Sequence, residues 1–189
     1  MTYPPYKKQE FSLRPYQQEA VDKAYNILCY HRLVYLAYEV RLGKTFISLA
    51  TADKLLGHLK NIKVLFVTTK KAIDLGGIQK DYDTLKPRFE MEIVSMDSLH
   101  KVTGKYDLII ADESHTIGGK FPKPSNRAKA LREIFKNNPL AFYIMLSGSP
   151  SPETKSQLFH QFWIFGQHDW HNINFFTWAK KYVEVQKKR

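Results

Sequence analysis

Short apolar segments alternate along this chain with longer segments in which apolar residues recur at helical spacing. Five segments are rich in β-branched and aromatic residues and nearly continuous in apolar side chains, which is typical of strands buried on both faces: 33–38, 63–68, 89–95, 106–112 and 140–148. Four segments between them have the length and spacing of amphipathic helices: 15–31, 44–59, 70–85 and 125–138. Helices that separate consecutive strands give parallel strand pairs, so the pattern predicts an α/β domain with a mainly parallel central sheet.

Size and composition predict one globular unit. A chain of 189 residues in which 43% are apolar can bury a core of its own. The one cysteine, Cys29, excludes an internal disulfide and a zinc site built from several cysteines. The first residues contain no apolar signal core, and no apolar run approaches the roughly 20 residues of a membrane helix. We therefore expect a soluble cytoplasmic protein that does not act at a membrane.

The charge balance points to a polyanionic partner. Lysine and arginine number 29 against 18 acidic residues, which gives a net charge of +11. Such an excess favours nucleic acid or another phosphate-rich partner, because the release of condensed counterions adds to binding. A basic protein with scattered surface lysines has the same composition, so charge by itself does not decide between the two.

Three segments with small or polar residues follow predicted strands. Gly43-Lys44-Thr45 follows the first strand and opens a helix, Asp112-Glu113-Ser114-His115 follows the fourth, and Ser147-Gly148-Ser149-Pro150 ends the fifth. Each pattern is common by itself, as a chance tripeptide, a solvated acidic pair or a turn. In a parallel α/β sheet, however, ligands collect at the carboxyl ends of the strands. Their order at three strand ends of one domain predicts a nucleotide site.

The chemistry of these segments suits ATP and Mg²⁺. Backbone N–H groups and the positive end of the helix after Gly43 can face a β-phosphate, and Lys44 would reach the β- and γ-phosphates. The Thr45 hydroxyl is suited to a Mg²⁺ position. Of the two carboxylates at 112 and 113, one can hold Mg²⁺ through water while its neighbour orients or deprotonates the attacking water. The hydroxyls of residues 147 and 149 are placed to sense the γ-phosphate.

Six motifs in order resemble those of a known family. They are "LRPYQQEAV" (13–21), "EVRLGKT" (39–45), "VLFVTTKKA" (64–72), "IVSMDSLHK" (93–101), "DLIIADESH" (107–115) and "LSGSP" (146–150). Together they are similar to the first motor lobe of superfamily 2 helicases and translocases, in particular the Swi/Snf-type branch in forms typical of bacteriophage genes. The resemblance covers most of residues 11–165 and implies a three-layer RecA-like P-loop NTPase fold. It also implies ATP hydrolysis coupled to nucleic acid, with double-stranded DNA favoured.

The resemblance also implies nucleotide roles for particular residues. Lys44, Asp112 and Glu113 form the expected catalytic set, in which Glu113 activates water and Asp112 holds Mg²⁺ together with Thr45. Gln17 would read the adenine, set by the "RPYQ" segment of the first helix. The residues expected to bind the nucleotide are Arg14, Gln17, Arg41, Gly43, Lys44 and Thr45.

Two further groups of residues follow from the same resemblance. Elements that couple the nucleotide to nucleic acid are His115, Ser147, Gly148 and Ser149. Contacts with the sugar-phosphate backbone, which position a strand without reading its sequence, are expected at Thr68, Thr69, Lys70, Ser95 and Ser98. A Thr-Thr-Lys segment is also a normal strand-to-helix turn, so this second group depends on the resemblance alone.

The phosphate loop departs from the family pattern at two positions. Tyr38 stands where Ala, Gly or Asp is usual, and Arg41 stands where Gly is usual. Glycine normally supplies unusual backbone angles and close approach to phosphate. Arg41 would instead place its guanidinium beside the phosphates or beside Glu39. Because residues 43–45 and the acidic pair remain, we expect an active loop of variant form, with a degenerate loop as the alternative.

Nothing after Pro150 resembles the second lobe of this family, so we expect the chain to be either a fragment cut at the lobe boundary or one half of a split motor. We assign residues 1–165 to the ATP-binding lobe and 166–189 to a basic, aromatic extension that leads towards a second RecA-like lobe absent from this chain. In motors of this class the second lobe supplies arginines that stabilise the transferring phosphate, and loss of such an arginine costs roughly 10³–10⁵ in rate. We therefore expect the isolated lobe to bind ATP-Mg²⁺ better than it hydrolyses it.

Two other readings of the sequence remain open. A small P-loop kinase would need an acceptor pocket and an arginine-bearing lid, whereas a non-catalytic basic DNA-binding module would retain the charge but carry a degenerate loop. The histidines and the aspartate of "QHDWHN" (His168, Asp169 and His171) lack a further ligand at a recognised spacing, so zinc is not expected. The aromatic residues around them are expected to pack the last helices onto the sheet or to cover a surface that a second lobe would bury, with base stacking as the alternative. They are Trp163, Phe165, Trp170, Phe175, Phe176 and Trp178.

Overall fold

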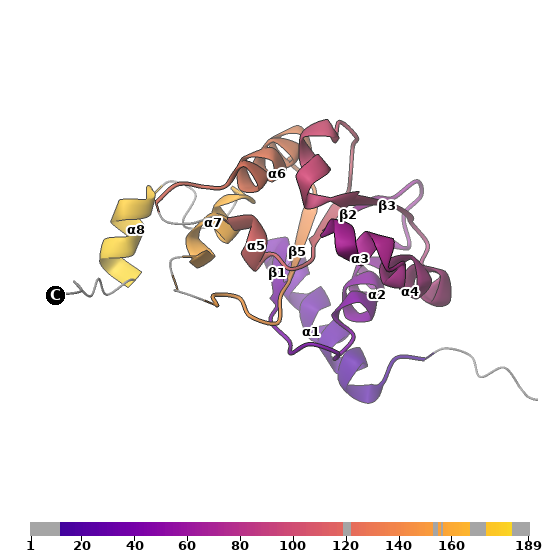
Figure 1. Ribbon diagram of the computed structural model, residues 1–189. Coiled ribbons are helices and arrows are strands. Elements are labelled where there is room, and N and C mark those ends of the chain that lie inside the picture. Colours follow the sequence, from indigo (N-terminus) through magenta and orange to yellow (C-terminus); the bar gives the residue numbers. More distant parts are fainter. Residues whose placement is uncertain (1–11, 119–121, 153–154, 156, 167–172, 183–189) are drawn as a thin grey trace, which may run out of the picture.

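The computed structural model describes residues 12–118, 122–152, 155, 157–166 and 173–182. Its centre is one sheet of five strands, all parallel (Figure 1). Across the sheet the strands lie in the order β1 (Leu33–Leu36), β5 (Phe142–Leu146), β4 (Leu108–Ala111), β2 (Lys63–Thr68) and β3 (Glu90–Ser95). The five predicted strands and their parallel pairing are thus confirmed.

Helices cover both faces of the sheet and form the outer two of three layers. One face carries α1 (Pro15–His31), α2 (Lys44–Leu56), α3 (Lys70–Asp74) and α4 (Gly77–Leu85). The other carries the short 3₁₀ helix η1 (Met96–Lys101), α5 (His115–Gly118), α6 (Asn126–Asn137) and α7 (Gln157–Trp163). A last helix, α8 (Phe175–Tyr182), packs on α7 away from the sheet. This is the three-layer α/β fold that the sequence predicted.

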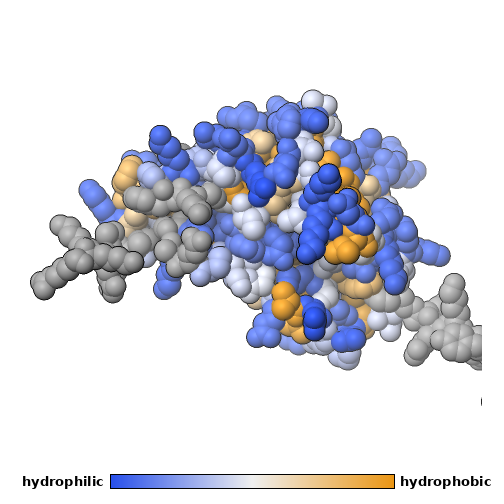
Figure 2. Space-filling view, in the orientation of Figure 1, coloured by the Kyte–Doolittle hydropathy of each residue, from blue (hydrophilic) through white to orange (hydrophobic). Residues whose placement is uncertain are grey.

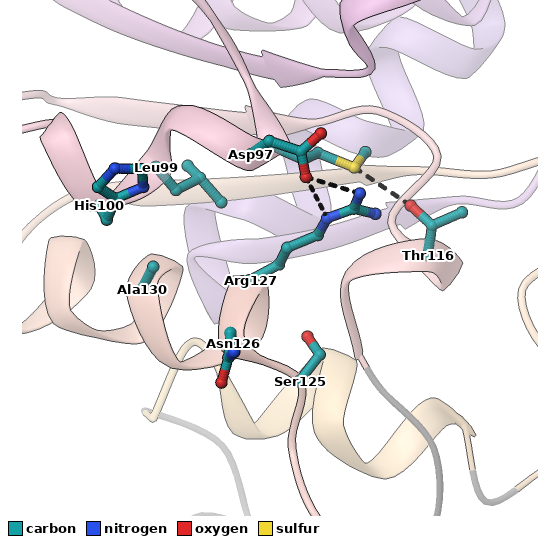
Figure 3. A pocket seen from close by; sticks show the side chains of 9 residues that line it. Asp97, Leu99, His100, Thr116, Ser125, Asn126, Arg127 and Ala130 are labelled. Atoms are coloured by element: carbon teal, nitrogen blue, oxygen red, sulfur yellow. Dashed lines mark hydrogen bonds and ion pairs between the residues drawn. The ribbon is translucent and has the colours of Figure 1, made fainter.

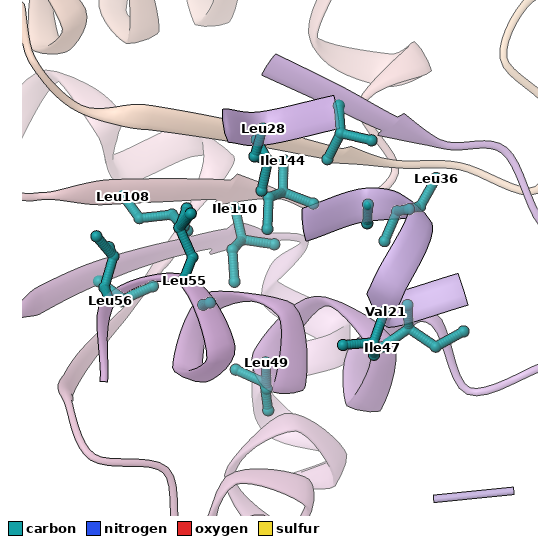
Figure 4. Close-up of a cluster of buried hydrophobic side chains, with 14 of the residues drawn as sticks. Val21, Leu28, Leu36, Ile47, Leu49, Leu55, Leu56, Leu108, Ile110 and Ile144 are labelled. Carbon is teal, nitrogen blue, oxygen red and sulfur yellow. The ribbon is translucent and has the colours of Figure 1, made fainter. Parts of the chain in front are cut away.

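Each face of the sheet has its own hydrophobic core, because side chains alternate along every strand. Val64 and Phe66 of β2 point into the core beneath α1 and α2, whereas Leu65 and Val67 point into the core beneath α6. Figure 4 shows the first core, in which Leu28 of α1 and residues of α2 meet the central strands. Strands buried in this way are continuous in apolar residues, which explains why the sequence located them.

Two local predictions were wrong. The segment 70–85 was expected to be one helix, but it forms α3 and α4, which are separated where Gly76 adopts a left-handed φ of 67°. Glycine reaches this conformation at no steric cost, so it ends the first helix. The strand β3 was expected to be buried on both faces, but it lies at the edge of the sheet, with Glu90 and Glu92 exposed.

The face of the domain seen in Figure 2 is largely hydrophilic, with scattered apolar areas. Large apolar side chains that are exposed include Leu75, beside the break between α3 and α4. No helix in the described part of the chain is long and apolar enough to cross a bilayer.

Aromatic side chains join the last two described helices. The ring centroids of Phe159 on α7 lie 5.3 Å from those of Phe175 and 5.4 Å from those of Trp178 on α8, and all three side chains are buried. The expectation that the aromatic residues pack the last helices onto the sheet is thus met by Phe165, which is buried in the core beneath α6, but not by Phe175 and Trp178, which pack on α7 instead. His168, Asp169 and His171 lie outside the described residues, and no group of three potential metal ligands occurs within them.

Acid is expected to weaken folding through His160. This α7 side chain is 2% exposed, its Nδ1 has no hydrogen-bond partner among the described residues, and burial lowers its pKa to about 4. In the unfolded chain the pKa of His160 has its ordinary value of about 6.5, so the unfolded chain binds a proton at a pH where the folded protein does not. The contribution of His160 to the free energy of unfolding is therefore fully present above pH 6.5 and is lost as the pH falls towards 4. Between pH 7 and pH 5 the loss is roughly 2 kcal/mol.

Urea unfolding at the two pH values measures this loss. His160→Leu should show a smaller loss than the wild type by that amount, while a substitution of the exposed His58 to leucine should leave the difference as it is. Equal acid sensitivity of wild type and His160→Leu would contradict the assignment.

Candidate nucleotide site

The strand order brings the three predicted segments to neighbouring positions on one edge of the sheet. Since all strands are parallel, their carboxyl ends share an edge, and β5 lies between β1 and β4. At that edge Leu36 pairs with Leu146, and Ala111 pairs with Met145. The loop after β1, the acidic segment after β4 and the serine segment after β5 therefore emerge side by side.

The loop between β1 and α2 wraps around Lys44, the first residue of α2. Its Nζ donates hydrogen bonds to the backbone carbonyls of Tyr38, at 3.0 Å, and Glu39, at 3.1 Å. Two residues of the loop have left-handed backbones, Gly43 with φ 74° and Arg41 with φ 68°. Arg41 thus occupies a position whose backbone favours glycine. Its exposed guanidinium forms no ion pair with any described carboxylate, Glu39 included.

Helix α1 supports this loop from below. The Gln17 side chain is buried, its Nε2 donates to the carbonyl of Leu42 at 3.3 Å, and its Oε1 accepts the N–H of Arg14 at 3.0 Å. A Cβ at Gly43 would overlap the Gln17 amide nitrogen. The amide expected to read adenine is therefore engaged with the loop and with the start of its own helix.

Asp112 lies at the end of β4 with one oxygen held by a neighbouring strand. Its Oδ2 accepts the hydroxyl of Thr68, the last residue of β2, at 2.9 Å. Burial raises the pKa of Asp112. Hydrogen bonds from the Thr68 hydroxyl and the backbone N–H of Glu113 lower it, as do electrostatic interactions with Lys44 and His115. The Lys44 ammonium is thus close enough to stabilise the Asp112 carboxylate.

Thr68 is placed differently from the expectation that it contacts nucleic acid. It is fully buried, and its hydroxyl is directed at Asp112. A hydroxyl enclosed in this way is unavailable to a phosphate backbone and orients the carboxylate instead. Periodicity gave no signal for this contact, because it depends on the pairing of β2 with β4.

Glu113, His115 and Ser147 meet beside this carboxylate. Glu113 has a left-handed φ of 46°, and its Oε2 lies 3.3 Å from Nδ1 of His115. The same ring nitrogen is 2.8 Å from Oγ of Ser147, which also accepts the backbone N–H of Ser149 at 3.0 Å. Of the predicted coupling residues, His115 thus contacts the acidic pair directly, and Ser147 is joined to it through His115.

The serine segment lies against the phosphate loop. A Cβ built on Gly148 would be 3.4 Å from Val40 Cγ1 and 3.8 Å from Lys44 Nζ. A larger residue here would press on the loop and its lysine. The structure thus brings Lys44, Asp112, Glu113 and the segment 147–149 together, as the order of motifs predicted.

The residues expected to contact nucleic acid lie on the other half of the same edge. Thr69 caps α3 by accepting the N–H of Ala72 at 3.2 Å, and Lys70 beside it is exposed. Ser95, at the end of β3, has its Oγ 3.0 Å from that of Ser98. Apart from Thr68, these side chains are at least partly accessible.

A cavity of about 540 Å³ lies beyond Ser95, between η1 and α6 (Figure 3). Its polar lining is largely paired internally, since Arg127 binds Asp97 at 2.7 Å and the Thr116 hydroxyl contacts Met96 and the carbonyl of Glu113. It adjoins the nucleotide site through Thr116 and is lined in part by the motif 93–101, but it contains none of the predicted site residues.

Comparisons with known proteins agree with this geometry. Residues 10–98 match the family model described as "Type III restriction enzyme, res subunit". The SWI2/SNF2 ATPase core of Sulfolobus solfataricus in complex with dsDNA superposes with a TM-score of 0.65 at 18% identity, covering 82% of this chain and 36% of that one. The chain has an α/β RecA-like fold.

Other structures show the same lobe within longer chains. The UvsW helicase from bacteriophage T4 gives a TM-score of 0.55 at 15% identity over 82% of this chain and 60% of its own. A Type ISP restriction-modification enzyme, LlaGI, gives 0.55 at 17% identity over 75% and 18%. No curated protein sequence matches the lobe. It spans about a third of the SWI2/SNF2 core and less than two thirds of UvsW.

Replacing Arg41 by glycine is expected to stabilise the lobe. A left-handed conformation costs a residue with a Cβ about 1–2 kcal/mol, part of which the greater freedom of unfolded glycine cancels. The expected gain of about 1 kcal/mol corresponds to a rise of about 2–4 °C in Tm, measured by thermal unfolding. Lys86→Gly, at φ 51° after α4, is the matched control and should give a similar gain. A destabilised Arg41→Gly would show that the guanidinium holds the loop.

Proposed function

We propose that this lobe binds Mg-ATP and serves as the ATP-hydrolysing half of a nucleic-acid-dependent motor. The observation that carries the proposal is the convergence of Lys44, Asp112 and Glu113 with the serine segment 147–149 at one sheet edge. The fold shared with helicase and translocase lobes supports it. A loop that had lost its function would not be expected to retain this arrangement.

The phosphates would replace the contacts that Lys44 makes now. Its Nζ donates hydrogen bonds to two loop carbonyls, at 3.0 and 3.1 Å, and a bound phosphate could replace these carbonyls as the acceptor. The first N–H groups of α2 carry a partial positive charge that favours the same anion. Lys44 would then bind the β- and γ-phosphates, and the loop around Arg41 would enclose them.

The residues present fit a magnesium ion. Asp112 offers a carboxylate whose second oxygen is already held by Thr68, and Thr45 offers a hydroxyl from the first turn of α2. Such hard oxygen ligands suit Mg²⁺, which typically retains several waters and binds phosphate oxygens as well. When bound, the ion would neutralise charge on the transferring phosphate.

Glu113 would act on the water that attacks the γ-phosphate. Its carboxylate is partly exposed at the ligand edge, and His115 lies 3.3 Å away on the side of Ser147. A carboxylate in this place can accept the proton of the water, while His115 and Ser147 hold the carboxylate in position. Loss of the γ-phosphate would therefore directly alter the surroundings of His115 and Ser147.

Nucleic acid would lie along the carboxyl ends of β2 and β3. Lys70 and the hydroxyls of Ser95 and Ser98 can bind a sugar-phosphate backbone, and the net charge of +11 adds attraction at longer range. We further propose double-stranded DNA as the track and a second RecA-like lobe, from outside the described residues, as the partner needed for efficient turnover. The dsDNA complex of the SWI2/SNF2 core supports the choice of track.

Binding of Mg-ATP by the purified chain tests the proposal. Wild type should bind saturably, and Lys44→Ala should bind about 10- to 150-fold more weakly, since a charge-assisted hydrogen bond contributes about 1.5–3 kcal/mol. Lys60→Ala, an exposed lysine away from the site, removes the same charge and should bind like wild type. Calorimetric titration with and without duplex DNA gives both affinities. DNA binding with no nucleotide binding would favour the non-catalytic module instead.

A further inference from the structure

Gln161 is a fully buried polar side chain on α7, in a place that an apolar residue could fill. Both N–H groups and the carbonyl oxygen of its amide are bonded. Oε1 accepts the hydroxyl of Tyr35, at 2.6 Å, and lies 3.3 Å from the Ser114 hydroxyl oxygen. Nε2 donates to the backbone carbonyls of Pro150, at 2.8 Å, and Gln157, at 3.0 Å. A buried amide that is satisfied so completely restricts its neighbours to one arrangement.

Three of these partners belong to the three segments of the nucleotide site. Tyr35 lies on β1, directly ahead of the phosphate loop. Ser114 lies between Glu113 and His115, and Pro150 ends the serine segment that rests against the loop. One side chain on α7 therefore contacts the strand ahead of the phosphate loop, the acidic segment and the serine segment.

The bonds through Ser114 constrain the acidic segment most closely. Ser114 is 1% exposed, its hydroxyl donates to Tyr35 Oη at 2.9 Å, and its backbone N–H donates to the carbonyl of Leu146 at 3.0 Å. Glu113, which precedes it, already has a left-handed backbone. The direction of the Glu113 carboxylate is thus set by how firmly Ser114 is held.

The opposite face of α7 carries the aromatic contacts with α8. Phe159 and His160 pack on Phe175, with ring centroids at 5.3 and 5.7 Å. On the site-facing side, a Cβ on Gly118 of α5 would lie 3.0 Å from Gln161 Cγ, so α5 and α7 are in close contact. A movement of the site segments that displaces Gln161 would therefore move α7 and, with it, α8.

We propose that Gln161 is a positioning residue of the nucleotide site. Through Ser114, Tyr35 and Pro150 it fixes Glu113 and the serine segment relative to the phosphate loop, and it transmits their movement on nucleotide binding to α7 and α8. The inference rests on the proposed function for its kinetic part. The bonds that carry it are independent of that function.

The test uses Gln161→Met, which keeps the shape of the side chain and removes its hydrogen bonds. Tyr35→Phe removes the hydroxyl that donates the shortest hydrogen bond to Gln161, and the double variant completes a double-mutant cycle. Tyr143→Phe is the matched control, since this buried hydroxyl on the neighbouring strand β5 has no hydrogen-bond partner among the described residues. Mg-ATP affinity and the single-turnover hydrolysis rate are measured for each.

Misplaced catalytic groups lower the rate while leaving ground-state binding intact. We expect Gln161→Met and Tyr35→Phe each to reduce the single-turnover rate about tenfold, with unchanged Mg-ATP affinity and no further loss in the double variant. The change in fluorescence of Trp163 and Trp178 on nucleotide binding should disappear in Gln161→Met, in a Trp170→Phe background. A wild-type rate in Gln161→Met, or losses that multiply to about a hundredfold in the double variant, would overturn the proposal.

Hydrogen exchange separates this inference from the proposed function. Without any nucleotide, the amides of Ser114 and Ser149 should exchange at least tenfold faster in Gln161→Met than in wild type, and Tyr143→Phe should leave them unchanged. Unchanged exchange would overturn the positioning role. If wild type failed to bind Mg-ATP while these amides exchanged faster in Gln161→Met, the proposed function would fall and the positioning role would stand.

Discussion

Glu113→Gln is expected to reduce ATP turnover by about 10²–10⁴-fold while leaving Mg-ATP binding essentially unchanged. Glutamine has the shape of glutamate, so the left-handed backbone and the position of the side chain beside His115 are kept. An amide oxygen cannot accept the proton of an attacking water as a carboxylate can. The substitution therefore removes an interaction that operates only during the reaction, and the rate falls without a change in ground-state affinity.

Single-turnover hydrolysis, with the protein in excess over labelled ATP, measures this loss even when turnover by the lobe is slow. Glu133→Gln is the matched control, because it makes the same change on the exposed face of α6, where Glu133 pairs with Lys136 at 2.6 Å. A Glu113→Gln variant that hydrolyses ATP at the wild-type rate would exclude Glu113 as the group that acts on water.

Gly43→Ala is expected to destabilise the lobe by about 3 kcal/mol and to weaken Mg-ATP binding at least tenfold. A left-handed φ of 74° costs alanine about 1–2 kcal/mol. The added Cβ also overlaps the Gln17 amide, so the bonds of Gln17 to Leu42 and Arg14 would break as it moves aside, which costs about 1–3 kcal/mol more. Displacement of the loop also moves Lys44, which adjoins Gly43.

Gly76→Ala separates the two contributions. Gly76 has a similar φ of 67°, but a Cβ there meets no atom within 4 Å, so only the backbone cost of about 1–2 kcal/mol applies. Urea unfolding of both variants gives the difference, and calorimetry gives the affinity. Equal destabilisation by the two substitutions would mean that Gln17 does not support the loop.

Much of the fold was predictable from the sequence, because buried parallel strands are continuous in apolar residues. The order of the strands was not predictable, although the alternation of Glu90, Met91 and Glu92 is a sign of the exposed face that β3 presents at the edge of the sheet. The break at Gly76 was missed because the apolar spacing continues on both sides of it. Spacing describes local periodicity, whereas edges and breaks depend on neighbours in space.

The same limit applies to the candidate site. The position of Lys44, Asp112 and the segment 147–149 followed from one geometric fact, that parallel strands end at a shared edge. The role of Thr68 depends on which strand lies beside β4, and that of Gln161 on how α7 packs. Hydrogen bonds between elements distant in the sequence leave no pattern in it.

The bond between Thr68 and Asp112 places the two halves of the ligand edge in mechanical contact. Asp112 belongs to the half that would hold nucleotide, and Thr68 ends the strand that leads within two residues to Lys70, on the half that would hold nucleic acid. A shift of the carboxylate is delivered to the neighbouring strand by one hydroxyl group. The segments that would bind nucleotide and nucleic acid thus follow two strands that are direct neighbours in the sheet, and one hydrogen bond connects them.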